Sequence, residues 1–159
     1  MSQELVYAIV RTIHDLFTAI WIGGMFALLF AVIPSIIKVF GKSKESKKLL
    51  KTIKNRLSLI VYIGFIALFI TGMLMANQSG MVAGLFNIST TYGVILTTKH
   101  IIYFIMIIIA ILRSRIVEKL KIKSETKEKL NMILLVINVI LAIVVVFLSG
   151  ELSALVKFK

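Results

Sequence analysis

Two histidines, His14 and His100, are the side chains best placed for chemistry, because a neutral imidazole is a common ligand of transition metals. Both lie in long apolar segments, where a charged or titratable side chain is costly. Arg11 and Asp15 flank His14, and Lys99 directly precedes His100. The sequence therefore predicts a polar cluster inside an apolar environment.

The polar residues of the first apolar segment share one face of a helix. Gly23 and Gly24 lie beside that face and would let a neighbouring helix or a flat ligand approach closely. A plainer interpretation stays open, in which Arg11 and Asp15 mark the water interface and His14 packs beneath them. The face is made of residues that recur at intervals of three and four: Arg11, His14, Thr18, Trp21 and Met25.

Copper is one ligand that the two histidines suggest. Imidazoles on facing helices can hold copper, and thioethers favour Cu(I). Met73 and Met75 end the second apolar segment on the same side of the membrane. The predicted metal ligands are therefore His14, His100, Met73 and Met75, although methionines in apolar helices more often serve packing alone.

Haem b is the alternative, with the two imidazoles as axial ligands of the iron. Trp21 and Tyr103 would then lie beside the macrocycle, and Arg11 or Lys99 would pair with its propionates. Counted from the inner ends of their segments, the two histidines differ in depth by eleven residues. At a rise of 1.5 Å per residue this is roughly 16 Å, so the pair meets only if the first helix leans or rides high.

The segments that carry these residues are typical of a membrane protein. The chain has 159 residues, of which 59% are hydrophobic, and its mean hydropathy is +1.01; soluble domains are about 45–50% apolar. Each apolar stretch is long enough to cross a bilayer, which takes roughly 20 residues. We expect one all-α domain over residues 1–159 with transmembrane helices at about 5–37, 57–76, 93–112 and 130–150.

Few enzyme classes remain open to this chain. It has no cysteine, which removes thiolate nucleophiles, zinc fingers and iron–sulfur clusters. No Ser/His/Asp arrangement has a plausible spacing for a hydrolase. We therefore expect no catalytic residues; if the protein is an enzyme, it is a haem-dependent membrane oxidoreductase.

The charge pattern predicts the orientation. The net charge is +12, and most Lys and Arg residues lie in stretches 38–56 and 113–129, whereas the connection 77–92 carries no charge. Short basic loops stay in the cytoplasm, so both termini are expected outside, in an antiparallel up-down four-helix bundle of the cytoplasmic membrane. The inner half of every helix is expected to be apolar or small, with no polar path to the inner side.

The same charges indicate partners. Basic loops attract the anionic lipids of the inner leaflet. Nucleic acid is not expected, because the positive charge follows membrane topology. A homodimer or a larger membrane complex could supply the polar path that one chain lacks.

Four short motifs resemble a known family. The stretch His14-Asp-Leu-Phe-Thr-Ala-Ile-Trp-Ile-Gly-Gly24 resembles the first helix of the CopD family of copper-resistance membrane proteins, with its His and Trp-x-Gly-Gly. The run Thr91-Tyr-Gly-Val-Ile-Leu-Thr-Thr-Lys99 is similar to the Thr-Pro-Tyr-Gly segment of that family, without its Pro. Between these, Arg56-Leu-Ser and Thr71-Gly72 fall where the family's second helix carries Arg-Phe-Ser and Thr-Gly.

The resemblance covers roughly residues 10–115 and implies that the protein handles copper, by binding or translocation, at the outer side of the cytoplasmic membrane. His14 is the site residue that it carries over, supported by Trp21 and Lys99; His100 is not part of the pattern. The layout also resembles the haem-binding membrane protoporphyrinogen oxidase-like family, which has an early His in its first helix and a Lys in its third. That likeness keeps the haem alternative open.

Overall fold

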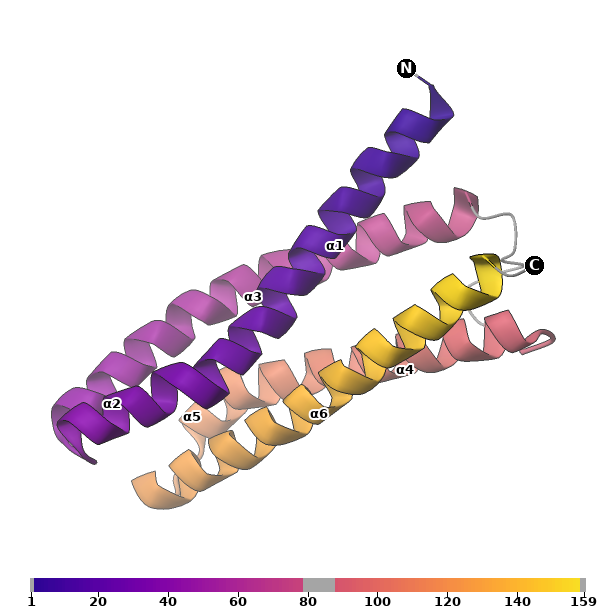
Figure 1. Ribbon diagram of the computed structural model, residues 1–159. Helices are drawn as coiled ribbons and strands as arrows, with labels where there is room; N and C mark the ends of the chain where they lie inside the picture. Colours follow the sequence, from indigo (N-terminus) through magenta and orange to yellow (C-terminus); the bar gives the residue numbers. More distant parts are fainter. Residues whose placement is uncertain (1, 79–87, 158–159) are drawn as a thin grey trace.

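The computed structural model describes residues 2–78 and 88–157, which form four long helices and no strand (Figure 1). Part of the uncharged connection expected at 77–92 lies outside the described residues. Each long helix is apolar enough to cross a membrane, which confirms an all-α, multi-pass membrane protein. In chain order the elements are α1 (Gln3–Ala27), η1 (Leu28–Val32), α2 (Ile33–Phe40), α3 (Lys44–Gln78), α4 (Thr91–Ile111), η2 (Leu112–Ile116), α5 (Val117–Lys119) and α6 (Ser124–Lys157).

The helices extend well beyond the apolar segments. Because α3 begins at Lys44 and α6 at Ser124, most of the stretches 38–56 and 113–129 is helical rather than loop. Lys, Glu and Leu are good helix formers, and a polar face costs nothing outside the bilayer. The backbone N–H of Ser46 donates to Ser43 Oγ at 3.1 Å, which caps the start of α3. Gly41 ends α2 with a φ of 60°, a conformation that favours glycine.

Pro34 lies inside the first long helix without ending it. Proline lacks an N–H and its ring clashes with the carbonyl four residues earlier. The π-helical turn η1 directly precedes Pro34 and widens the backbone there, and the helix then continues to Phe40. The first membrane segment is therefore one long helix with a local irregularity.

The four helices pack chiefly in two pairs, α1 with α3 and α4 with α6. Met106, Leu135 and Ala142 form the most deeply buried part of the interior, with exposed fractions of 1%, 1% and 0%. Large apolar side chains such as Phe30 and Phe147 point outward, as expected for a bundle that lipid surrounds.

The N-terminal part of α1 leans away from the other helices (Figure 1). Leu5, Ile9, Ile13 and Leu16 are all exposed there, whereas Trp21 and Met25 further along are buried. The first helix is thus anchored by its second half, and its first half is held by few contacts.

An ion pair ties the beginnings of α3 and α6 together. Lys47 Nζ lies 2.8 Å from Glu128 Oε1 and donates to Ser124 Oγ at 3.4 Å. The two basic stretches therefore lie at one end of the bundle, which we call the basic end (residues 38–56 and 113–129).

Ala142 provides a test of the packing. Ala142→Leu forces additional side-chain carbon atoms into a full interior and should lower the free energy of unfolding by about 1–3 kcal/mol. Ala154→Leu makes the same change at an exposed position of the same helix and should be nearly neutral. Thermal unfolding in detergent measures both, and equal effects would contradict the packing of α6 described here.

Candidate functional site

His14 is held in place by a hydrogen bond from α1 to α3. Its Nδ1 lies 2.9 Å from Thr71 Oγ1, and the ring is half-buried. The Thr71 hydroxyl also donates to the Ala67 carbonyl at 2.7 Å. A hydroxyl has a single hydrogen, so with that hydrogen on Ala67, Thr71 accepts from the Nδ1–H of His14. In the neutral ring this arrangement assigns the Nδ1–H tautomer and leaves Nε2 unprotonated, as a metal ligand requires.

Gly72 supplies the space for the imidazole. A Cβ at position 72 would lie 3.6 Å from His14 Cε1, which is ordinary van der Waals contact. Alanine would therefore fit at this position, whereas a larger side chain would displace the ring. Thr71 orients the ring through its hydrogen bond, and Gly72 leaves room for the ring because it has no side chain.

Charged groups surround the ring on α1 and α4. Lys99 is half-buried on α4 and interacts electrostatically with His14 and with Asp15. Arg11 Nε lies 3.8 Å from Asp15 Oδ2, with both side chains more than half exposed, so this pair contributes little stability. We call His14, Thr71, Gly72 and Lys99 the His14 site.

His100 lies beside Lys99 on α4 and is half-buried. Its Nδ1 is shielded from solvent, and the ring interacts with the Leu96 backbone one turn earlier in the same helix. Within the described residues, no hydrogen bond joins His100 to His14. The described residues also contain no group of three or more His, Asp and Glu side chains that could hold a metal by themselves.

The two candidate thioethers occupy different faces of α3. Met75 is half-buried and follows Thr71 by one helical turn, so it shares the face that meets His14. Met73 is 43% exposed and lies off that face. Of the two methionines, Met75 is therefore the one placed to assist His14.

Trp21 and Tyr103 come together, but as part of a packed aromatic cluster. The Trp21 ring contacts Phe65 edge-on with centroids 4.7 Å apart, and Tyr103 at 5.6 Å. The Tyr103 hydroxyl donates to the Phe65 carbonyl at 2.8 Å. This cluster joins α1, α3 and α4, and on α1 it begins two turns after His14.

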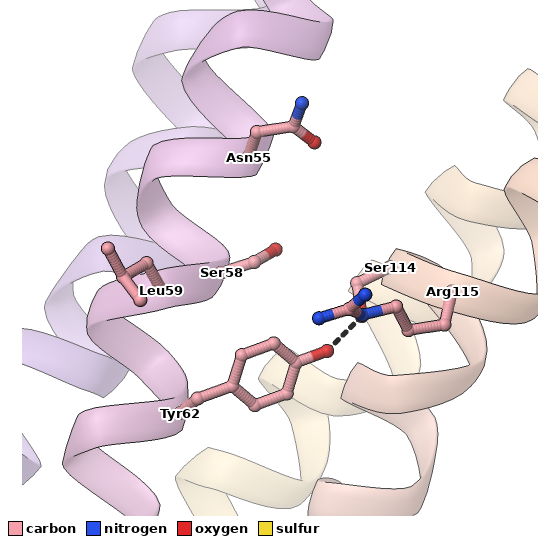
Figure 2. Close-up of a pocket in the computed structure, with 6 residues that line it drawn as sticks. All are labelled: Asn55, Ser58, Leu59, Tyr62, Ser114 and Arg115. Atoms are coloured by element: carbon pink, nitrogen blue, oxygen red, sulfur yellow. Dashed lines mark hydrogen bonds between the residues drawn. The ribbon is translucent and has the colours of Figure 1, made fainter.

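A polar cavity of about 330 Å³ lies near the basic end (Figure 2). The Tyr62 and Ser114 hydroxyls share a hydrogen bond there, and the Arg115 guanidinium lies 5.9 Å from the centre of the Tyr62 ring. The expectation of purely apolar or small inner helix halves is therefore wrong, because single polar residues on separate helices face one another. The cavity is lined by Asn55, Ser58, Leu59, Tyr62, Ser114 and Arg115.

The sequence identified His14 but missed its partner. Thr71 and Gly72 entered only as part of the resemblance, without a role. The available signal was a threonine inside an apolar segment, since a buried hydroxyl needs a partner. The cavity residues gave no signal, because each stands alone in its own apolar or basic stretch.

The tautomer of His14 is directly testable. The chain has two histidines, so His100→Gln leaves a single imidazole to observe. ¹⁵N NMR of protein labelled with ¹⁵N-histidine, recorded where the ring is neutral, should show a protonated Nδ1 and an unprotonated Nε2. Thr71→Val removes the acceptor and should shift the tautomer populations, whereas Thr71→Ser should not. A predominant Nε2–H form in the unsubstituted site would contradict the hydrogen-bond assignment.

Comparison with known proteins identifies the family. The sequence model of the family described as CopD, Copper resistance protein D, matches residues 51–154, which is more than half of the chain. The matched range contains Thr71, Gly72 and Lys99 but begins after α1, so His14 lies outside it. No curated protein and no solved structure matches the chain. The chain belongs to the CopD family of copper-resistance membrane proteins.

Proposed function

We propose that the protein handles copper by binding Cu(I) at the His14 site. The observation that carries the proposal is the hydrogen bond from His14 Nδ1 to Thr71. Histidines that bind metals commonly donate their other ring N–H to a fixed acceptor, which sets the tautomer and the ring orientation. Membership of a copper-resistance family supplies the identity of the metal.

The proposed ligands are Nε2 of His14 and the thioether of Met75. Imidazole and thioether both suit Cu(I), and neither adds negative charge to an apolar site. His100 is a candidate third ligand from α4, because its imidazole is half-buried and directly follows Lys99 of the His14 site. A site with so few ligands can accept and release copper readily.

The same proposal includes the topology. Trp21 of α1 contacts Phe65 of α3, and His14, seven residues earlier in α1, contacts Thr71, six residues later in α3. The two helices therefore run antiparallel, which supports an up-down bundle. The Lys47–Glu128 pair brings the two basic stretches to one end. With that end in the cytoplasm by the positive-inside rule, both termini and the His14 site face outward from the cytoplasmic membrane.

Binding at the outer face is favoured over passage of copper through a single chain. A cation leaving the His14 site toward the cytoplasm would approach Arg113 and Arg115 at the basic end, and like charges repel strongly at low dielectric. No observation on the described residues favours haem over copper. A Soret band in protein from haem-supplied cells, lost in His14→Ala, would reverse this choice.

Substitutions at His14 and Thr71 test the proposal. In detergent under reducing conditions, competition with a chromophoric Cu(I) chelator should show loss of binding in His14→Ala. Thr71→Val should weaken binding about tenfold, the usual effect of removing the hydrogen-bond partner of a metal-bound histidine. Thr71→Ser should retain affinity, because it keeps the hydroxyl.

Thr12→Val is the matched control, since the exposed Thr12 hydroxyl bonds only to the Ala8 carbonyl of its own helix. Unchanged Cu(I) affinity in His14→Ala would exclude His14 as a ligand. Equal losses in Thr71→Val and Thr12→Val would show that the hydrogen bond plays no part.

Substitutions of the two methionines give an independent test of the proposed ligand set. Met75→Leu should weaken Cu(I) binding because it removes a soft ligand from the face that meets His14, whereas Met73→Leu should leave binding unchanged. The same chelator competition measures both variants. A larger loss in Met73→Leu than in Met75→Leu would contradict the proposed ligand set.

A further inference from the structure

A second, deeper cavity adjoins the one shown in Figure 2. It has a volume of about 110 Å³ and shares Ser58 and Ser114 with the first. Its other polar lining residues come from three helical segments and are Lys54, Arg113, Asn131 and Asn138. The two spaces together form what we call the basic cavity.

The polar part of the lining is cationic and rich in hydrogen-bond donors, whereas most of the deeper space is lined by apolar side chains such as Trp21 and Leu28. Lys54, Arg113 and Arg115 supply three positive charges, and no Asp or Glu is among the described residues that line either space. The remaining polar groups are hydroxyls and amides. Such a set suits an oxyanion and repels a metal cation.

Two buried polar atoms of this cavity lack partners. Arg113 Nε and Asn138 Oδ1 are shielded from solvent and have no hydrogen-bond partner among the described residues. Asn138 is 1% exposed, and its Nδ2 donates to the Met106 carbonyl at 3.4 Å. Only Arg113 Nε is a donor: a buried guanidinium N–H without an acceptor is costly, so an oxygen of a bound group would satisfy it, whereas Asn138 Oδ1 needs a donor.

We propose that the basic cavity binds a phosphoryl group, carried by an anionic phospholipid or by a free phosphate compound. Arginine recognises phosphate through several N–H donors at fixed geometry, and Arg115 lines the outer space and Arg113 the deeper one. The Ser58 hydroxyl, and whichever of the hydrogen-bonded Tyr62 and Ser114 hydroxyls accepts from the other, can donate to the remaining phosphate oxygens. This inference does not depend on copper binding at the His14 site.

The surroundings favour the lipid source. Leu59 lines the outer space and is 62% exposed, and Ile116 directly follows Arg115 and is 46% exposed. An acyl chain can lie on these apolar side chains while the headgroup enters between α3 and η2. Figure 2 shows Asn55, Ser58 and Tyr62 projecting from α3 toward the segment that carries Ser114 and Arg115.

The test uses the purified full chain in an uncharged detergent, titrated with dihexanoyl phosphatidylglycerol. Binding should be saturable, and Arg113→Gln should weaken it about tenfold, as expected for loss of a charge-assisted hydrogen bond. Arg56→Gln removes the same charge from an exposed position of α3 outside the cavity and should stay within about twofold. Equal weakening in both variants would show nonspecific attraction to basic residues and overturn the proposal.

A second pair of variants tests the proposal if Arg113→Gln fails to fold. Asn55→Asp places a carboxylate at the exposed rim of the cavity and should abolish binding, whereas Thr52→Asp places it on α3 outside the cavity and should not. Dihexanoyl phosphatidylcholine should bind at least tenfold more weakly than the phosphatidylglycerol, and equal binding would overturn the proposal. Inorganic phosphate that competes at millimolar concentration would support a free phosphate compound as the ligand, and failure to compete would support the lipid.

Discussion

The hydrogen bond between His14 and Thr71 is the interaction on which the candidate site depends. Inside a bilayer a polar side chain cannot turn to water, so its partner must come from the protein. The Thr71 hydroxyl donates its single hydrogen to the Ala67 carbonyl, so its oxygen can only accept a hydrogen bond from His14. The imidazole orientation and, in the neutral ring, the free Nε2 both follow from this bond.

The two ends of the bundle have opposite chemistry. The His14 site offers an unprotonated nitrogen and a nearby thioether, which suit a soft cation, although Lys99 limits how much positive charge can enter. The basic cavity offers guanidinium and hydroxyl donors, which suit an oxyanion. The aromatic cluster of Trp21, Phe65 and Tyr103 lies between them and fills the interior. A copper ion and a phosphoryl group would therefore bind at separate places without competing.

The sequence predicted the membrane class and the four helices because long apolar runs have few alternatives. It did not predict where the helices end, because Lys-rich and Glu-rich stretches such as 44–56 continue a helix beyond the bilayer. His14 stood out as a titratable group in an apolar segment. Thr71 did not, because its contact with His14 joins positions 57 residues apart. The basic cavity was missed for the same reason, since Ser58 and Ser114 become neighbours only after folding.

The proposed copper site also depends on a helix whose N-terminal half is held by few contacts. The family match covers α4 and most of α3 and α6, and α3 and α4 contribute Thr71, Gly72 and Lys99, but the imidazole comes from α1. The N-terminal turns of α1, before His14, lean away from the bundle and leave their apolar side chains exposed (Figure 1). A metal bound between His14 and α3 would add a second link beside the Thr71 bond. Copper occupancy and the docking of α1 on α3 would then stabilise each other, because each is favoured by the geometry that the other requires.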